Sequence, residues 1–271
     1  MVTRTYLFVP GNRPERFAKA LASGADAIVL DLEDAVAPVA KGDARDAIAR
    51  WAGSATQAER ERVVVRINDA GASAFAEDLR LLSETRLAQV MLPKAESAAQ
   101  INELVAAIPS ACVLPLVETA QGIAKARELA ASASVSRLIF GTLDFALDLD
   151  LHIEDSSEAL VYAAGCLAVA SRIAGIDAPV AGVTPQLDDE ERLLSDLAWA
   201  RRHGFGAKLC IHPRQVAAIH AALAPSPSEL DWARRVLAAE AASPGAAQLD
   251  GRMIDRPVIR QATRTLQRAK K

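Results

Sequence analysis

The chain of 271 residues carries a formal net charge of −3, and 51% of its residues are hydrophobic but only 4% are aromatic. The near-neutral charge gives no broad electrostatic basis for binding nucleic acid or an anionic membrane, and no apolar run approaches the length of a membrane span. Three well-separated cysteines are typical of free thiols in a reducing compartment. The N-terminus lacks the pattern of a signal peptide, so we expect a cytoplasmic protein.

Eight short apolar runs predict buried strands, and segments rich in Ala, Glu and Arg with helical spacing lie between them. The runs are Tyr6–Val9, Ala27–Leu32, Val63–Ile67, Val90–Leu92, Val113–Val117, Arg137–Phe140, Val180–Val183 and Ala207–Ile211. This alternation predicts an α/β fold and favours a (β/α)8 TIM barrel over a doubly wound parallel sheet, although the strand count alone suits both.

Nearly sixty residues follow the last predicted strand. They predict two helices, at about Ser228–Ala242 and Pro257–Ala269, separated by a flexible loop over 243–251. We therefore expect residues 1–225 to form the barrel, with the active site at the C-terminal ends of its strands. Residues 226–271 are expected to form a helical extension and lid that contacts a neighbouring subunit.

Three of the predicted strands run into charged residues, namely Arg66, Glu118 and Asp144. The C-terminal ends of the strands in a barrel meet at one face, so these side chains are expected to lie near one another. Magnesium prefers one or two protein carboxylates with water and substrate oxygens, which makes Glu118 and Asp144 candidate metal ligands. The Arg66 guanidinium could grip a substrate carboxylate or stabilise an enolate oxygen.

Each of these three residues also has a purely structural interpretation. Glu118 or Asp144 could cap the helix that follows, where a negative charge suits the helix dipole. Arg66 could form a structural ion pair with Glu33 or Asp34. The residues alone leave both interpretations open.

Three carboxylates, Asp31, Glu33 and Asp34, follow the second predicted strand. If the strand persists, alternation directs Asp31 and Glu33 to one face and Asp34 to the other. Some of these carboxylates are expected to orient Arg66 or metal-bound water. Arg13, in a turn after the first strand, could accept an anion, but an ordinary turn explains it as well.

Seven segments in this order form a recognisable set: LFVPGNR (7–13), DLEDAV (31–36), VRIN (65–68), LPKAE (92–96), ETA (118–120), FGTLD (140–144) and KLCIHP (208–213). Together they resemble the citrate lyase beta-subunit-like (CitE-like) branch of the HpcH/HpaI aldolase superfamily. The resemblance runs from about Thr5 to Ala269, which is nearly the whole chain.

The resemblance implies a (β/α)8 barrel, usually a trimer or an assembly of trimers, that makes or breaks a carbon–carbon bond next to a CoA thioester with Mg²⁺. It implies Glu118 and Asp144 as metal ligands and Arg66 as a catalytic and substrate-binding arginine. Arg13 and Glu33, which lie in two of the matching segments, are further candidate substrate-binding residues.

The C-terminal segment GRMID (251–255) resembles the motif with which stand-alone members present a catalytic aspartate to a neighbour's active site. This implies Asp255 as the base. Two departures from the family pattern are visible. The aldolases of free pyruvate adducts carry a histidine where this chain has Asp34, and relatives generally carry a phenylalanine where Ala247 precedes Gln248.

We therefore predict a Mg²⁺-dependent lyase or synthase for a β-hydroxyacyl-CoA such as citramalyl-CoA, malyl-CoA or citryl-CoA, with a keto acid as the other small-molecule partner. One alternative is a citrate lyase beta subunit that cleaves a citryl thioester on an acyl carrier protein. An alternative of another class is a non-catalytic barrel for assembly or ligand sensing. The resemblance favours a homotrimer.

Overall fold

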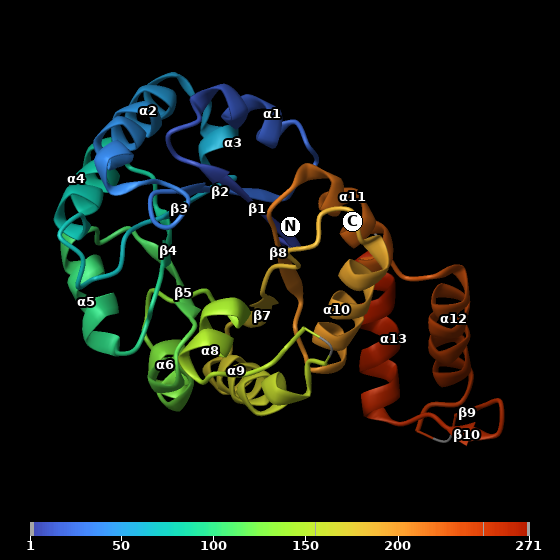
Figure 1. Ribbon diagram of the computed structural model, residues 1–271. Coiled ribbons are helices and arrows are strands. Elements are labelled where there is room, and N and C mark those ends of the chain that lie inside the picture. The colour runs from blue at the N-terminus through green and yellow to red at the C-terminus, as the bar shows by residue number, and fades with distance from the viewer. Residues whose placement is uncertain (1–2, 155, 246, 270–271) are drawn as a thin grey trace. The chain divides into compact units, whose positions relative to one another are not determined.

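The computed structural model describes residues 3–154, 156–245 and 247–269. The chain divides into two compact units, one from Thr3 to Ile219 and the other from His220 to the C-terminus. Figure 1 shows the strands of the first unit surrounded by helices. Over the described residues, no helix combines the length and the apolar character needed to cross a membrane.

The first unit is a closed barrel of parallel strands in sequence order, in which the eighth strand pairs with the first. The strands are β1 Thr5–Pro10, β2 Ala27–Asp31, β3 Val63–Arg66, β4 Gln89–Leu92, β5 Cys112–Val117, β6 Arg137–Phe140, β7 Asp177–Ala181 and β8 Ala207–Cys210. All eight predicted strands are confirmed. The seventh begins three residues earlier and ends two residues earlier than its apolar pattern predicts.

Helices follow the strands and cover the outside of the barrel (Figure 1). They are η1 Pro14–Arg16, α1 Phe17–Leu21, η2 Pro38–Ala40, α2 Lys41–Ser54, α3 Gln57–Arg60, α4 Phe75–Thr85, α5 Ala98–Ala107, α6 Ala120–Ala124, α7 Ala126–Ala130, α8 Thr142–Asp148, η3 Glu158–Leu160, α9 Val161–Ala174, α10 Glu190–Arg202 and α11 Pro213–Leu223. The first turn of α8 follows β6 after only Gly141, so this helix begins directly at the end of its strand.

Apolar side chains fill the barrel interior, because alternate residues of each strand point inward. The core contains Tyr6, Ala27, Val29, Val64, Met91, Leu114, Leu116, Ile139, Val180, Ala207 and Leu209. Phe8 and Val183 pack against it and remain partly exposed. The interior is therefore a packed core, and polar chemistry is confined to the strand ends.

The second unit contains α12 Pro227–Ala242 and α13 Arg256–Ala269, which pack against each other. Two short antiparallel strands, β9 Gln248–Leu249 and β10 Arg252–Met253, replace the predicted flexible loop. Asp250 and Gly251 connect them, both with positive φ (50° and 75°). An Asp-Gly pair favours this kind of tight hairpin turn, so the sequence contained a signal that the loop prediction missed.

Candidate active site

A cavity of about 370 Å³ lies at the C-terminal ends of the barrel strands. Its lining includes Arg66 at the end of β3, Glu118 directly after β5 and Asp144 in the first turn of α8. Apolar residues of the upper core, among them Phe8 and Leu116, line it as well. The barrel thus brings together the three charged residues that the strand ends predicted.

Arg66 is held mainly by Asp31, the last residue of the neighbouring strand β2. Nε of Arg66 donates to one carboxylate oxygen of Asp31 over 2.7 Å, and Nη2 donates to the other over 2.6 Å. Asp31 is itself fixed, since its two oxygens also accept the backbone N–H groups of Glu33 and Ala35. A two-pronged pair of this kind fixes the plane of the guanidinium.

Glu33 and Asp34 approach the same guanidinium. The Arg66 Nη1 atom lies 2.8 Å from a Glu33 carboxylate oxygen in an ion pair without hydrogen-bond geometry, and it donates to Asp34 over 3.4 Å. The alternation of Asp31 and Glu33 against Asp34, expected only if the strand persisted, does not arise, because β2 ends at Asp31. Beyond that residue the chain turns, and all three carboxylates converge on Arg66.

The positive charge of Arg66 is strongly stabilised although the residue is buried, with only 9% of its surface exposed. Burial acts against the charged form, but the bonds to Asp31 and the charges of Glu33 and Asp34 outweigh it and raise the pKa of Arg66 above its usual value. The Phe8 ring lies 4.9 Å from the guanidinium carbon, close enough for a cation–π contact. Arg66 therefore presents a permanent positive charge to the cavity.

Glu118 is buried, and one of its oxygens accepts the backbone N–H of Lys94 over 2.8 Å. Burial raises the pKa of Glu118 to about 8, and the charges of Glu33 and Asp144 add to this effect, while the bond from Lys94 and the charge of Arg66 oppose it. Gly141 makes room for this side chain, since a Cβ atom there would lie 2.5 Å from a carboxylate oxygen of Glu118.

Asp144 is exposed and lines the cavity from the third residue of α8. Glu118 does not cap the helix that follows it. Thr119 does so, by accepting the N–H of Gly122 over 3.1 Å. The structural interpretation of Glu118 as a helix cap is therefore not supported.

Within the described part of the chain, no group of three or more His, Cys, Asp and Glu residues is placed to hold a metal ion. Glu118 and Asp144 would bind a cation only if water or substrate oxygens completed its coordination, which is the arrangement that magnesium prefers. Burial and like charges penalise the ionised form of Glu118, and a bound cation would relieve that penalty. The donor set therefore fits a hard divalent cation.

Two further predicted site residues are Arg13 and Asp255. Arg13 is exposed in the turn after β1, where it pairs with Glu15 at 3.4 Å, and it is not part of the cavity lining. Asp255 belongs to the C-terminal unit, where it is exposed and accepts the N–H of Val258 in the first turn of α13. The roles of Arg13 and Asp255 stay predictions.

Sequence reasoning missed two supports of the site. The first is the backbone of Lys94, whose φ of 45° aims its N–H at Glu118. The second is Gly141, where the absence of a side chain admits Glu118. The glycine directly before the Thr-Leu-Asp run could have indicated a close approach at this strand end, whereas the Lys94 conformation has no sequence signal.

The barrel fold agrees with comparisons to known proteins. The sequence model of the HpcH/HpaI aldolase/citrate lyase family matches residues 4–213, and a model of C–C bond lyases of the TIM-barrel fold matches residues 165–271. The chain belongs to the HpcH/HpaI aldolase/citrate lyase family.

Members of this family are similar to the chain over almost its full length. A citrate lyase subunit beta-like protein of Mycobacterium tuberculosis is 39% identical, with 97% of this chain and 94% of the relative covered. A (3S)-malyl-CoA thioesterase of Cereibacter sphaeroides is 33% identical, with 98% and 94% covered. The structure of M. tuberculosis CitE in complex with magnesium, acetoacetate and coenzyme A matches with a TM-score of 0.89, at 38% identity and with 99% and 98% covered.

Proposed function

We propose that this chain is a Mg²⁺-dependent carbon–carbon lyase, or the reverse synthase, acting on a β-hydroxyacyl-CoA such as citramalyl-CoA, malyl-CoA or citryl-CoA. The observation that carries the proposal is the shared lining of one barrel-mouth cavity by Arg66, Glu118 and Asp144. The similar CitE structure, which holds magnesium, acetoacetate and coenzyme A, supports it.

Glu118 and Asp144 would hold the magnesium ion, which supplies electrophilic stabilisation of oxygen charge when bound. Their arrangement suits this role because one carboxylate is buried and fixed by a backbone N–H, while the other is exposed on a helix turn. Glu118, the fixed ligand, would define the position of the ion, and Asp144, the exposed ligand, would remain accessible to solvent.

Arg66 would bind the carboxylate of the keto-acid part or the developing enolate oxygen. A guanidinium has five N–H donors, and the two taken by Asp31 leave three that Glu33, Asp34 and a ligand can share. Because Asp31 fixes the guanidinium before any substrate arrives, little reorganisation would be needed when charge develops in the transition state.

In the cleavage direction, a base removes the proton of the β-hydroxyl group, and the electron pair of that O–H bond forms the carbonyl of the keto acid. The Cα–Cβ bond breaks, its electron pair passes to the thioester as an enolate, and the enolate takes up a proton at carbon. We assign the base to Asp255 of a neighbouring copy. In support, Asp255 is an exposed carboxylate at the start of α13 and lies in a segment that resembles the family motif.

A second candidate is hydrolysis of the thioester, either after the cleavage step or in its place. The 33% identity to a (3S)-malyl-CoA thioesterase over nearly the whole chain favours it. The two reactions leave different products, because hydrolysis releases free CoA together with the carboxylic acid. We further propose a homotrimer, on the family resemblance, and keep action on an acyl-carrier-bound thioester as the alternative substrate form.

The deciding experiment is product analysis by mass spectrometry on citramalyl-CoA, malyl-CoA and citryl-CoA, with Mg²⁺ and with a chelator. Metal-dependent release of acetyl-CoA and a keto acid from one of them would support the lyase. Free CoA and an intact hydroxy acid would support hydrolysis in place of cleavage, and free CoA with acetate and a keto acid would support hydrolysis after it. If all three stay intact, the test is repeated on a citryl thioester of an acyl carrier protein, and inertness there would favour a non-catalytic barrel.

A further inference from the structure

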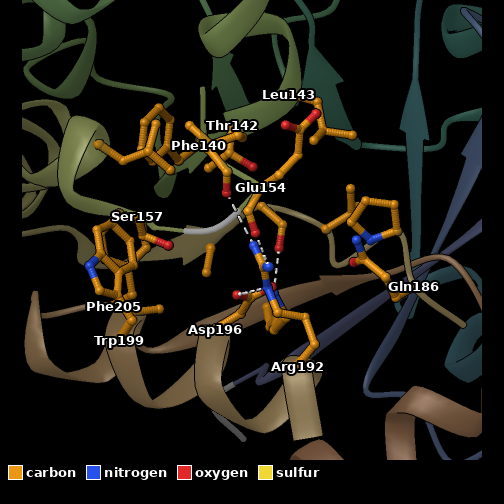
Figure 2. A pocket seen from close by; sticks show the side chains of 18 residues that line it. Phe140, Thr142, Leu143, Glu154, Ser157, Gln186, Arg192, Asp196, Trp199 and Phe205 are labelled. Atoms are coloured by element: carbon orange, nitrogen blue, oxygen red, sulfur yellow. Dashed lines mark hydrogen bonds and ion pairs between the residues drawn. The ribbon is translucent and has the colours of Figure 1, made fainter. Parts of the chain in front are cut away.

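A second cavity, of about 90 Å³, shares part of its lining with the barrel-mouth cavity. Figure 2 shows the side chains that line it. Ile139, Val180 and Leu209 point into the barrel core, so Phe140, Ala181 and Lys208 on the same strands point outward, towards the helix layer. These three residues line the second cavity, which we call the side cavity. Helix α10 closes it from the other side with Trp199 and Ala200.

The walls of the side cavity are largely apolar, and the principal polar groups on them already have partners in the protein. The Lys208 ammonium donates to the carbonyl of Gly182 over 2.8 Å. Arg192 donates to Asp196 over 2.8 Å and to the carbonyls of Ile153 and Glu154 (Figure 2). An apolar occupant would therefore leave the charges of Lys208, Arg192 and Asp196 paired.

The side cavity adjoins the barrel-mouth cavity through a thin partition. Thr142, Leu143, Gly182 and Val183 line both cavities. At Gly182 the wall has no side chain, and a Cβ atom there would lie 2.3 Å from the hydroxyl oxygen of Thr142. The side chain of Thr142, which is only half-buried, therefore separates the two spaces at this point. The partition at this point therefore consists of one small side chain and a residue without one.

We propose that the side cavity is a specificity pocket that accepts an apolar substituent carried by the thioester substrate next to its reacting carbon. The inference rests on the proposed function, which places the reacting carbons in the neighbouring barrel-mouth cavity. A cavity of about 150 Å³ holds benzene, so a cavity of about 90 Å³ has room for about three carbon atoms. The substrate class is thus a β-hydroxyacyl-CoA with a short alkyl branch.

The test measures equilibrium binding of unreactive thioesters in the presence of Mg²⁺, by calorimetry. Acetyl-, propionyl-, butyryl-, pentanoyl-, hexanoyl- and octanoyl-CoA carry no β-hydroxyl group, so their carbon–carbon bonds cannot be cleaved, and mass spectrometry after each titration verifies that the thioester is intact. We expect the dissociation constant to fall about fourfold for each added methylene, the value of burying a CH₂ group. The gain should end after about three methylenes, when the pocket is full.

Ala200→Leu adds a side chain to the side cavity at a residue that does not itself line the barrel mouth. This substitution should leave the affinity for acetyl-CoA unchanged and abolish the increase in affinity with acyl-chain length. Ala198→Leu, the same change at an exposed position of the same helix, should keep the gain. If circular dichroism shows that Ala200→Leu is misfolded, Ala200→Val replaces it, with a reduced gain expected.

A dissociation constant that is independent of chain length in the unchanged protein would overturn the inference. So would an identical chain-length dependence in Ala200→Leu. Either result, with acetyl-CoA still bound, leaves the proposed lyase intact. Failure of acetyl-CoA itself to bind would instead overturn the CoA-thioester substrate class, and this inference with it.

Discussion

Arg66 binds both carboxylate oxygens of Asp31, over 2.7 Å and 2.6 Å, across the two adjacent strands β2 and β3. Asp31 and Arg66 are register partners at the C-terminal ends of these strands. The side chain that presents positive charge to the cavity is therefore positioned by the barrel itself and needs no mobile loop.

Asp31→Asn should weaken the fold and the site together. The substitution leaves Arg66 in a buried place without its principal counter-charge, and breaking a buried pair in this way costs about 3 kcal/mol. Chemical denaturation measures the loss. Asp34→Asn is the matched control, because that side chain is 66% exposed and 3.4 Å away, and it should cost less than about 1 kcal/mol. Equal losses in the two variants would contradict the special role of Asp31.

Asp144→Asn should abolish Mg²⁺-dependent turnover and leave the fold intact. It removes one of two negative oxygen ligands, which should lower the rate about a hundredfold or more, while the exposed side chain contributes little to stability. Turnover is measured against Mg²⁺ concentration and folding by circular dichroism. Asp150→Asn serves as control, since its exposed, left-handed position (φ 54°) also suits asparagine. Full activity in Asp144→Asn would refute the metal assignment.

Gly141→Ala should displace Glu118. The added Cβ atom would lie 2.5 Å from both the Cβ atom and a carboxylate oxygen of Glu118, and relief of such overlap costs about 1–3 kcal/mol. We expect weaker Mg²⁺ binding by calorimetry together with lower stability. Gly165→Ala, in the interior of α9 with open space around its Cα, should instead stabilise the protein by about 0.5–1 kcal/mol. Unchanged Mg²⁺ affinity in Gly141→Ala would argue against Glu118 as a ligand.

Because Lys208 is buried, the free energy of unfolding should increase with pH in mildly alkaline solution. Burial lowers the pKa of Lys208 from 10.5 to about 8 in the folded protein. Between pH 8 and 9 the unfolded chain binds the extra proton at Lys208, so the free energy of unfolding rises with pH by up to about 1.4 kcal/mol per unit. Above pH 9 the buried Cys210 thiol, whose pKa burial raises to about 12, contributes an opposite slope. Lys208→Met should therefore remove the rise between pH 8 and 9, as measured by urea denaturation. Lys19→Met, an exposed control, should retain it; the same slope in both variants would exclude Lys208 as its source.

The barrel followed from the sequence because buried parallel strands produce short β-branched runs, and each of these runs became a strand. Arg66, Glu118 and Asp144 could be placed at one mouth for the same reason, although Asp144 lies in the first turn of α8 and not at the end of β6. The pairing of Arg66 with Asp31 could not be predicted from the sequence, because it depends on the residue at which β2 ends and on the register between β2 and β3.

The side cavity was also beyond sequence reasoning. It is a gap between the outer face of three strands and one helix, and its size depends on how Trp199 and Phe140 pack rather than on any local pattern. Burial patterns identify which residues face the helix layer, but they do not reveal whether that layer is completely filled.

Lys94 adopts a left-handed backbone conformation, with φ of 45°, that costs a residue with a side chain about 1 kcal/mol. Its N–H group is thereby directed to Glu118. Stability and function consequently oppose each other at this one residue. A glycine in its place would relieve the strain, yet it would also free the backbone to relax away from the carboxylate. Efforts to raise the thermal tolerance of this protein should therefore leave position 94 untouched.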